Sequence, residues 1–126
     1  MNFQTPLARA RGLGSAREGS HYWQRQRVTA VALAPLAFWL AFALARLPDA
    51  SYVEVVNWIN APWNAVLLLS FIFLAFFHAM LGLQIVIEDY VHIDWLKMLA
   101  ILGVRLMSWF LALAAGFAVL RIVFEA

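Results

Sequence analysis

Three long apolar runs, separated by short polar segments, dominate the pattern along the chain. The first run, VTAVALAPLAFWLAFALARL, covers residues 28–47, and two more lie at about residues 62–87 and 95–124. A transmembrane helix needs about 20 mostly apolar residues to cross about 30 Å of hydrocarbon. Each run meets that length. The pattern therefore predicts an all-α membrane protein with three transmembrane helices.

The polar segments complete this organisation. Residues 1–27 carry five arginines against the single acid Glu18. Glycines interrupt this N-terminal arm, so we expect its first part to be irregular. Between the first two runs, PDASYVEVVNWINAPW mixes charges and prolines with Tyr52 and Trp58, which is typical of an interfacial loop or a short surface helix. We divide the chain into the basic arm and a membrane domain, residues 28–126.

The distribution of positive charge predicts an orientation. The segment between the second and third runs adds Lys97 on the same side as the arginine-rich arm, whereas the other side holds Arg46 and Arg121. Because segments rich in lysine and arginine stay in the cytoplasm, we expect the N-terminus to be cytoplasmic. The expected location is the inner membrane of a bacterium, or the equivalent membrane of an organelle with the N-terminus in the matrix.

Composition narrows the function classes. The chain is 65% hydrophobic and 13% charged, with mean hydropathy +0.81, whereas soluble domains are about 25% charged. Too few residues lie outside the apolar runs to form a soluble domain of typical size, so any catalytic globular module must be on another chain. A net charge of +2, with the basic residues gathered at one end, argues against nucleic acid. The chain has no cysteine, so any metal chemistry must use histidine.

His78 stands inside the second apolar run, in FFHAMLGLQIVIEDYVH. Ionisable residues within a span usually face the bundle interior and mark a functional path. One reading is a neutral histidine bonded to a neighbouring helix. The other is an axial haem ligand, with one nitrogen on iron and the other donating to a carbonyl one turn back. Gly82 lies on the same helical face, where it either opens space for a flat macrocycle or lets helices pack closely.

Polar residues Glu88, Asp89 and Tyr90 close the second run. If the helix continues that far, Asp89 shares the face of His78, three turns away. Acids and a tyrosine at this boundary can be a stop signal and an aromatic belt residue. They can also serve a quinone, because quinone reduction consumes protons and needs a site touching both apolar space and water. The spacing leaves both readings open.

Basic residues flank or enter the spans at several points. His21, Arg25 and Arg27 precede the first run, and Arg105 lies inside the third. Arginines at such positions bind phospholipid phosphates by default. If a haem is present, its propionates need cationic partners, which guanidinium groups supply. For Arg105 we expect the side chain to reach toward lipid headgroups.

Two segments carry a family resemblance. HAMLGLQIVIEDYVH and TPLARARGLGSAREGSHYWQRQRVTA resemble the second-span motif and the N-terminal arm of the hydrophobic membrane anchor (D) subunit of succinate dehydrogenase, respiratory complex II, in its alphaproteobacterial and mitochondrial branch. The similarity covers nearly the whole chain. It implies a second membrane anchor subunit of three helices (cytochrome b556-type), with haem b held between the two. It also implies that the pair seats an iron–sulfur subunit and a flavoprotein subunit on the membrane.

The resemblance also implies roles for individual residues. His78 matches the axial ligand of haem b, and Tyr90 matches the tyrosine that hydrogen-bonds ubiquinone, with Asp89 as the acid beside it. His21 and Arg27 match arm residues near the haem propionates. The resemblance thus implies a subunit that is not catalytic alone but helps to pass electrons from succinate to ubiquinone.

Other functions remain open at this point. One is a fumarate reductase anchor that uses menaquinone. A transporter accessory subunit, with His78 and Arg105 lining a polar path, and a structural assembly factor are non-redox alternatives. The residues alone leave these alternatives level with the redox reading, and the resemblance favours the succinate dehydrogenase anchor.

Overall fold

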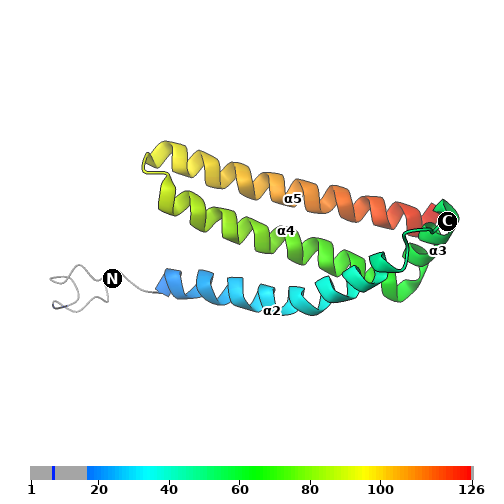
Figure 1. Cartoon of the computed structure of the whole chain (residues 1–126). Coiled ribbons are helices and arrows are strands. Elements are labelled where there is room, and N and C mark those ends of the chain that lie inside the picture. Colours follow the sequence, from blue (N-terminus) through cyan, green and yellow to red (C-terminus); the bar gives the residue numbers. More distant parts are fainter. Residues whose placement is uncertain (1–6, 8–16, 126) are drawn as a thin grey trace.

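The computed structural model describes residue 7 and residues 17–125, and the side chains of residues 7 and 21–125. The helices are α2 (Arg17–Ala45), α3 (Tyr52–Asn60), α4 (Pro62–Tyr90) and α5 (Asp94–Glu125), as shown in Figure 1. The described residues contain no strand. Helices α2, α4 and α5 are long and apolar enough to cross a membrane. The prediction of an all-α chain with three spans is confirmed.

The helix bounds differ from the predicted spans: most ends extend further, but α2 stops at Ala45, two residues before the predicted end at residue 47. Helix α2 begins at Arg17, so the boundary at residue 28 marks a change of composition and not of secondary structure. It also continues past Pro35 to Ala45. Helix α4 runs three residues beyond the predicted end at residue 87, and α5 gains one residue at each end. Most of the first half of the arm, predicted to be irregular, lies outside the described residues.

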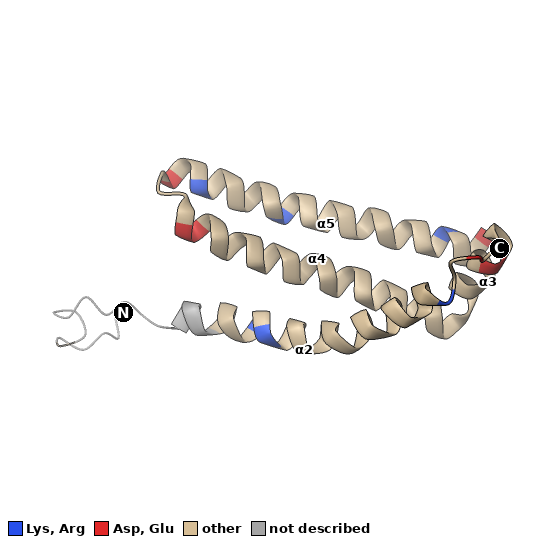
Figure 2. Cartoon of the chain, viewed as in Figure 1, with Lys and Arg blue, Asp and Glu red and all other residues tan. Residues whose placement is uncertain are grey.

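Helix α4 lies in the middle, packed against α2 on one side and α5 on the other. Successive long helices run in opposite directions (Figure 1). The start of α2 and the α4–α5 connection lie at one end, here called the N-terminal end, and α3 lies with the end of α5 at the other, the α3 end. Charged residues gather toward the two ends (Figure 2). The described part of the arm, residues 17–27, and the α4–α5 connection thus lie at the same end, as predicted.

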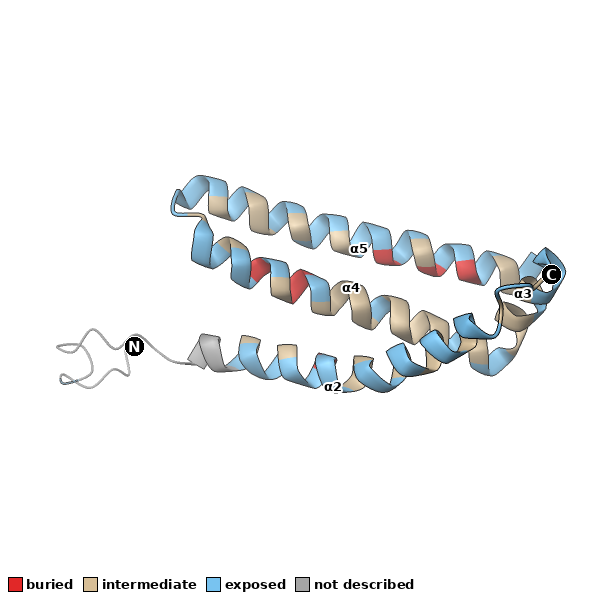
Figure 3. Cartoon of the chain, viewed as in Figure 1, coloured by how far each residue is buried: buried red, intermediate tan, exposed pale blue. Residues whose placement is uncertain are grey.

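Small residues on α5 bring it close to α4 toward the α3 end. Ala112, Gly116 and Val119 are buried and recur at helical spacing, so they form one face (Figure 3). A Cβ added at Gly116 would lie 3.3 Å from Cζ of Phe73 on α4. In lipid, helices associate through such close packing because the solvent is as apolar as the side chains.

Helix α3 closes the α3 end as a short surface helix, one of the two predicted alternatives. Its first residue follows Ser51, whose hydroxyl accepts a hydrogen bond from the Glu54 N–H, while the Glu54 carboxylate accepts from the Ser51 N–H. These two bonds form a capping box. Trp58 stacks on Trp39 of α2 with ring centroids 5.6 Å apart. The Asn64 amide donates to the Trp58 carbonyl and ties α3 to α4.

Most large apolar side chains of the three long helices are exposed (Figure 3). Helix α2 has the fewest buried residues of the three: among its described side chains, Thr29 alone is buried. A lipid-facing helix that buries a polar residue needs a polar partner for it inside the bundle. Thr29 therefore leads directly to the candidate site.

Candidate functional site

The imidazole of His78 on α4 bridges to α2 through both ring nitrogens. Its Nδ1 lies 2.9 Å from Thr29 Oγ1, and its Nε2 lies 3.3 Å from the Gln26 Nε2. Within this chain, His78 is thus bonded to a neighbouring helix, as one of the two sequence readings required. The expectation that one nitrogen donates to a carbonyl one turn back is wrong, because Thr29 from another helix takes that position.

The contacts of Thr29 are compatible with a His78 tautomer that carries the proton on Nδ1. Its Oγ1 lies 2.9 Å from the Arg25 carbonyl and 3.0 Å from the Gln26 carbonyl, both in the preceding turn of α2. A hydroxyl has one proton and two lone pairs. If Thr29 donates that proton to its own helix, it accepts from His78 Nδ1–H, and both contacts of the imidazole are satisfied in this tautomer. The Nε2 of His78 then presents a lone pair, and the Gln26 amide N–H donates to it.

Gln26 lies across the space that Gly82 opens. A Cβ added at Gly82 would lie 3.5 Å from Gln26 Nε2, which is ordinary van der Waals contact. The other end of the same amide, Gln26 Oε1, is buried without a hydrogen-bond partner among the described residues. The carboxamide is thus held at its nitrogen end, between the His78 ring and the Gly82 backbone, and is unsatisfied at its oxygen end.

A second polar network ties the three spans together. The Arg105 guanidinium on α5 donates from Nη2 and Nε to Gln84 Oε1 on α4, at 2.9 and 3.3 Å, and its Nη2 lies 3.3 Å from the Tyr22 hydroxyl on α2. Gln84, which is only 4% exposed, donates from Nε2 to Glu88 Oε1 at 2.7 Å. Arg105 is exposed, and its guanidinium bonds Gln84 and Tyr22 within this chain; that it reaches toward lipid headgroups stays a prediction.

Asp89 and Tyr90 lie at the end of α4, away from His78. The helix continues through Tyr90, so the condition under which Asp89 shares the face of His78 is met. Twelve residues at about 1.5 Å each separate His78 from Tyr90 by about 18 Å along the helix. Both Asp89 and Tyr90 are exposed. The chain therefore carries two separate candidate positions, one within the span and one at its polar end.

The two arm residues expected near haem propionates lie in the N-terminal part of α2. His21 and Arg27 are both exposed. The Arg27 guanidinium lies over the ring of Trp23, 4.1 Å from its centroid. Arg27 is adjacent in sequence to Gln26, which places it within one turn of the residues that contact His78.

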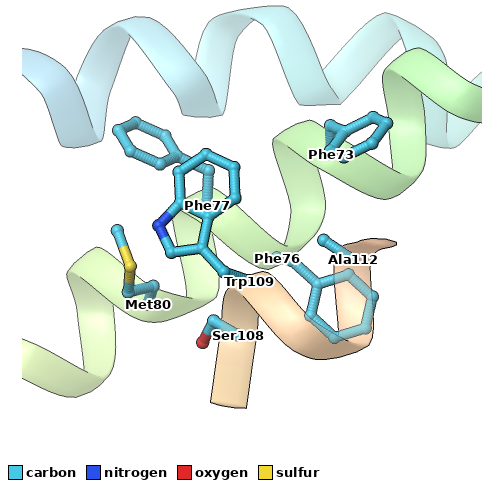
Figure 4. A pocket seen from close by; sticks show the side chains of 7 residues that line it. All are labelled: Phe73, Phe76, Phe77, Met80, Ser108, Trp109 and Ala112. Atoms are coloured by element: carbon cyan, nitrogen blue, oxygen red, sulfur yellow. The ribbon is translucent and has the colours of Figure 1, made fainter. Parts of the chain in front are cut away.

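Two cavities among the described residues are not lined by any predicted site residue. The first, about 10 Å³, lies between α4 and α5 and is apolar (Figure 4). The second, about 520 Å³, lies at the α3 end, beside the Trp39–Trp58 stack. The described residues also contain no cluster of three metal-ligating side chains. A metal bound at His78 would need further ligands from a cofactor or from outside the described residues.

Residues 1–120 match the family described as succinate dehydrogenase/fumarate reductase transmembrane subunit. The chain belongs to this family. It is 38% identical over 109 residues to the succinate dehydrogenase hydrophobic membrane anchor subunit of Rickettsia bellii, covering 85% of this chain and 86% of the relative. It is 31% identical over 121 residues to the subunit of the same name from Paracoccus denitrificans, covering 96% and 93%. No solved structure matches. The resemblance drawn from the sequence is confirmed.

The structure adds residues of this family member that sequence reasoning missed. Thr29 and Gln26 hold His78, and Gln84 and Tyr22 hold Arg105. A signal existed for two of them, because Thr29 and Gln84 are polar residues within apolar runs. Such residues usually face the bundle interior. Their partners were not predictable, because they depend on how each helix is rotated.

Proposed function

We propose that this chain is the membrane anchor subunit of a succinate:ubiquinone oxidoreductase, that His78 is an axial ligand of haem b, and that Tyr90 and Asp89 form part of the ubiquinone site. Family membership supports the anchoring role. One observation carries the haem assignment: His78 lies within a span with its Nδ1 2.9 Å from Thr29 Oγ1, and the tautomer with the proton on Nδ1 would leave a lone pair on Nε2 for iron.

The residues present fit one axial position of a haem. A histidine ligand needs an unprotonated nitrogen for iron and a partner that orients the other N–H. His78 and Thr29 meet both requirements, and Gly82 leaves room beside the ring. Haem b, when bound, supplies one-electron transfer. His21 and Arg27 would serve its propionates, and the second axial ligand would come from the partner anchor subunit.

The end of α4 suits the reacting end of a quinone. Tyr90 is 78% exposed at the point where the apolar helix meets water. In the proposed role its phenol donates a hydrogen bond to a quinone carbonyl, and Asp89 supplies protons from the aqueous side. Quinone reduction takes up two electrons and two protons, and the electrons would come from succinate through flavin and iron–sulfur centres on partner chains.

The remaining features support assembly with partner subunits. Helices α2 and α5 expose apolar side chains along their length, which suits lipid together with a second three-helix anchor subunit. We propose that the iron–sulfur and flavoprotein subunits sit at the N-terminal end, near Tyr90. That end would face the cytoplasm in the bacterial inner membrane, with phospholipid around the remaining surface.

The test uses the complex purified from its own membrane. His78→Ala should abolish or shift the reduced-minus-oxidised haem spectrum, because the iron loses a ligand, whereas His92→Ala, at an exposed histidine in the α4–α5 connection, should leave it unchanged. Tyr90→Phe should lower succinate–quinone reductase turnover with haem content intact. Its control is Tyr52→Phe, at an exposed tyrosine at the α3 end.

Each arm of this test has a contradicting result. An unchanged spectrum in His78→Ala would refute ligation, and unchanged turnover in Tyr90→Phe would refute the quinone role. The quinone that co-purifies separates the fumarate reductase alternative, since that reading requires menaquinone in place of ubiquinone.

A further inference from the structure

We propose that Gln26 is a built-in placeholder for the haem iron. In this proposal its carboxamide occupies the ligand position at His78 Nε2 while the chain is haem-free, and leaves when haem binds. Thr29 stays in place and keeps the proton on Nδ1 throughout. This inference rests on the proposed role of His78 as a haem ligand and assigns the residues that prepare it.

The Gln26 amide lies at the ring nitrogen of His78 that iron would bind. Gln26 donates to the same Nε2 lone pair that iron would use, at 3.3 Å. One lone pair cannot serve both a hydrogen-bond donor and a metal at once. If iron takes Nε2, the Gln26 contact must break. The amide also covers Gly82, where an added Cβ would lie 3.5 Å from its nitrogen, so the space beside that glycine opens when the amide moves.

The Gln26 amide is hydrogen-bonded at its nitrogen and has no partner for its oxygen among the described residues. A buried carbonyl oxygen without a partner costs free energy relative to one that is hydrogen-bonded, and Gln26 Oε1 has no partner among the described residues. Leaving this position therefore gives up one weak bond and allows the oxygen to find a partner. An amide with one hydrogen bond and one unpaired oxygen loses little when haem displaces it from His78.

Thr29 differs from Gln26 on each of these points. Its hydroxyl donates to carbonyls of its own helix at 2.9 and 3.0 Å, and the residue is only 7% exposed. Its bond to Nδ1 does not compete with a ligand at Nε2. A partner on the distal nitrogen fixes the tautomer and raises the basicity of a ligating histidine. Thr29 is thus a positioning residue for His78.

The two residues on one imidazole should therefore respond in opposite directions. The experiment takes the whole complex from haem-depleted cells and titrates it with haemin, following the Soret band. Gln26→Ala should tighten haem binding by about two- to tenfold, because one net hydrogen bond that opposes binding is removed. Thr29→Val should weaken it by about tenfold or more, the usual effect of losing the partner of a ligating histidine.

Matched variants separate these effects from damage to the fold. Gln24→Ala removes an exposed amide two residues away on α2 and should leave haem affinity unchanged. Thr29→Ser keeps the hydroxyl and should restore most of the affinity that Thr29→Val loses. Nitrogen-15 NMR of His78 in the haem-free full chain should show the proton on Nδ1, and Thr29→Val should release that preference.

The outcomes distinguish this inference from the proposed function. Unchanged or weaker haem binding in Gln26→Ala, with a spectrum that still depends on His78, would overturn the placeholder and leave the ligand assignment standing. A proton on Nε2 in the haem-free chain would overturn it as well. A complex whose haem spectrum ignores His78→Ala would overturn both.

Discussion

The N-terminal end and the α3 end of the bundle are held together by different kinds of contact. Toward the N-terminal end, side-chain hydrogen bonds cross between helices: His78 to Thr29 and Gln26, and Arg105 to Gln84. Toward the α3 end, packing predominates: small residues of α5 lie against α4, and Trp58 of α3 stacks on Trp39 of α2.

The difference indicates where function is concentrated. A polar or ionisable side chain within a span costs free energy and usually has a functional role, while close packing of small residues is enough to associate helices. The α3 end shows that this chain can pack its helices without buried polar groups. Under the proposed function, the polar contacts toward the N-terminal end would serve the haem site as well as helix association.

The largest expected effect would break the packed region. Gly116→Leu would drive a side chain into Phe73, whose ring already lies 3.3 Å from an added Cβ. We expect a loss of about 1–3 kcal/mol of unfolding free energy, typical of overpacking, measured by denaturant titration in mixed micelles. Gly103→Leu is the control on the same helix, because nothing lies within 4 Å of an added Cβ there. Equal effects of the two variants would contradict tight packing at Gly116.

A smaller effect would loosen the polar region. Gln84→Leu removes the acceptor of Arg105 and the donor to Glu88, and hydrogen bonds between helices of a native membrane protein contribute about 0.6 kcal/mol on average and up to about 1.7 kcal/mol. The same titration should show a loss of that size. In the control Ser70→Ala, the lost hydroxyl donates only to the Val66 carbonyl within α4, so the loss should be smaller. Equal losses would show that the network does not join the helices.

The smallest effect concerns pH at the cap of α3. Hydrogen bonds from the Ser51 N–H, and secondarily from its hydroxyl, lower the pKa of Glu54 below its ordinary 4.5. Because the folded pKa is depressed, the stabilisation is present above the ordinary value and is lost as pH falls through the lower, folded value. Chemical-shift titration should therefore show Glu54 titrating below 4.5, and Ser51→Ala, which removes the hydroxyl but keeps the backbone N–H, should raise the pKa only part of the way back. A titration unaffected by Ser51→Ala would contradict the capping box.

Much of the fold was predictable because length and hydropathy define membrane spans. The early start of α2 was not, because Gly19 and the charged and polar residues between positions 17 and 27 do not continue the apolar pattern, so the predicted span began at residue 28. Once a long helix has nucleated, each further residue adds a hydrogen bond at little cost, so α2 extends through this segment to Arg17.

The site was predictable only in part. His78 is visible in the sequence because a histidine within an apolar run is unusual. Its partners Thr29 and Gln26 are 49 and 52 residues away, and only the rotation of α2 against α4 brings them to the ring. The hydrogen bond from Arg105 to Gln84 was not predictable for the same reason, because it depends on how α5 is rotated against α4.

The most direct test of the anchoring role is mass spectrometry of the chains that co-purify with this protein from its native membrane in mild detergent, with haem measured in the same sample. The account predicts a flavoprotein, an iron–sulfur protein, a second small membrane chain and a b-type haem. Recovery of the intact chain without soluble redox partners and without haem would contradict it.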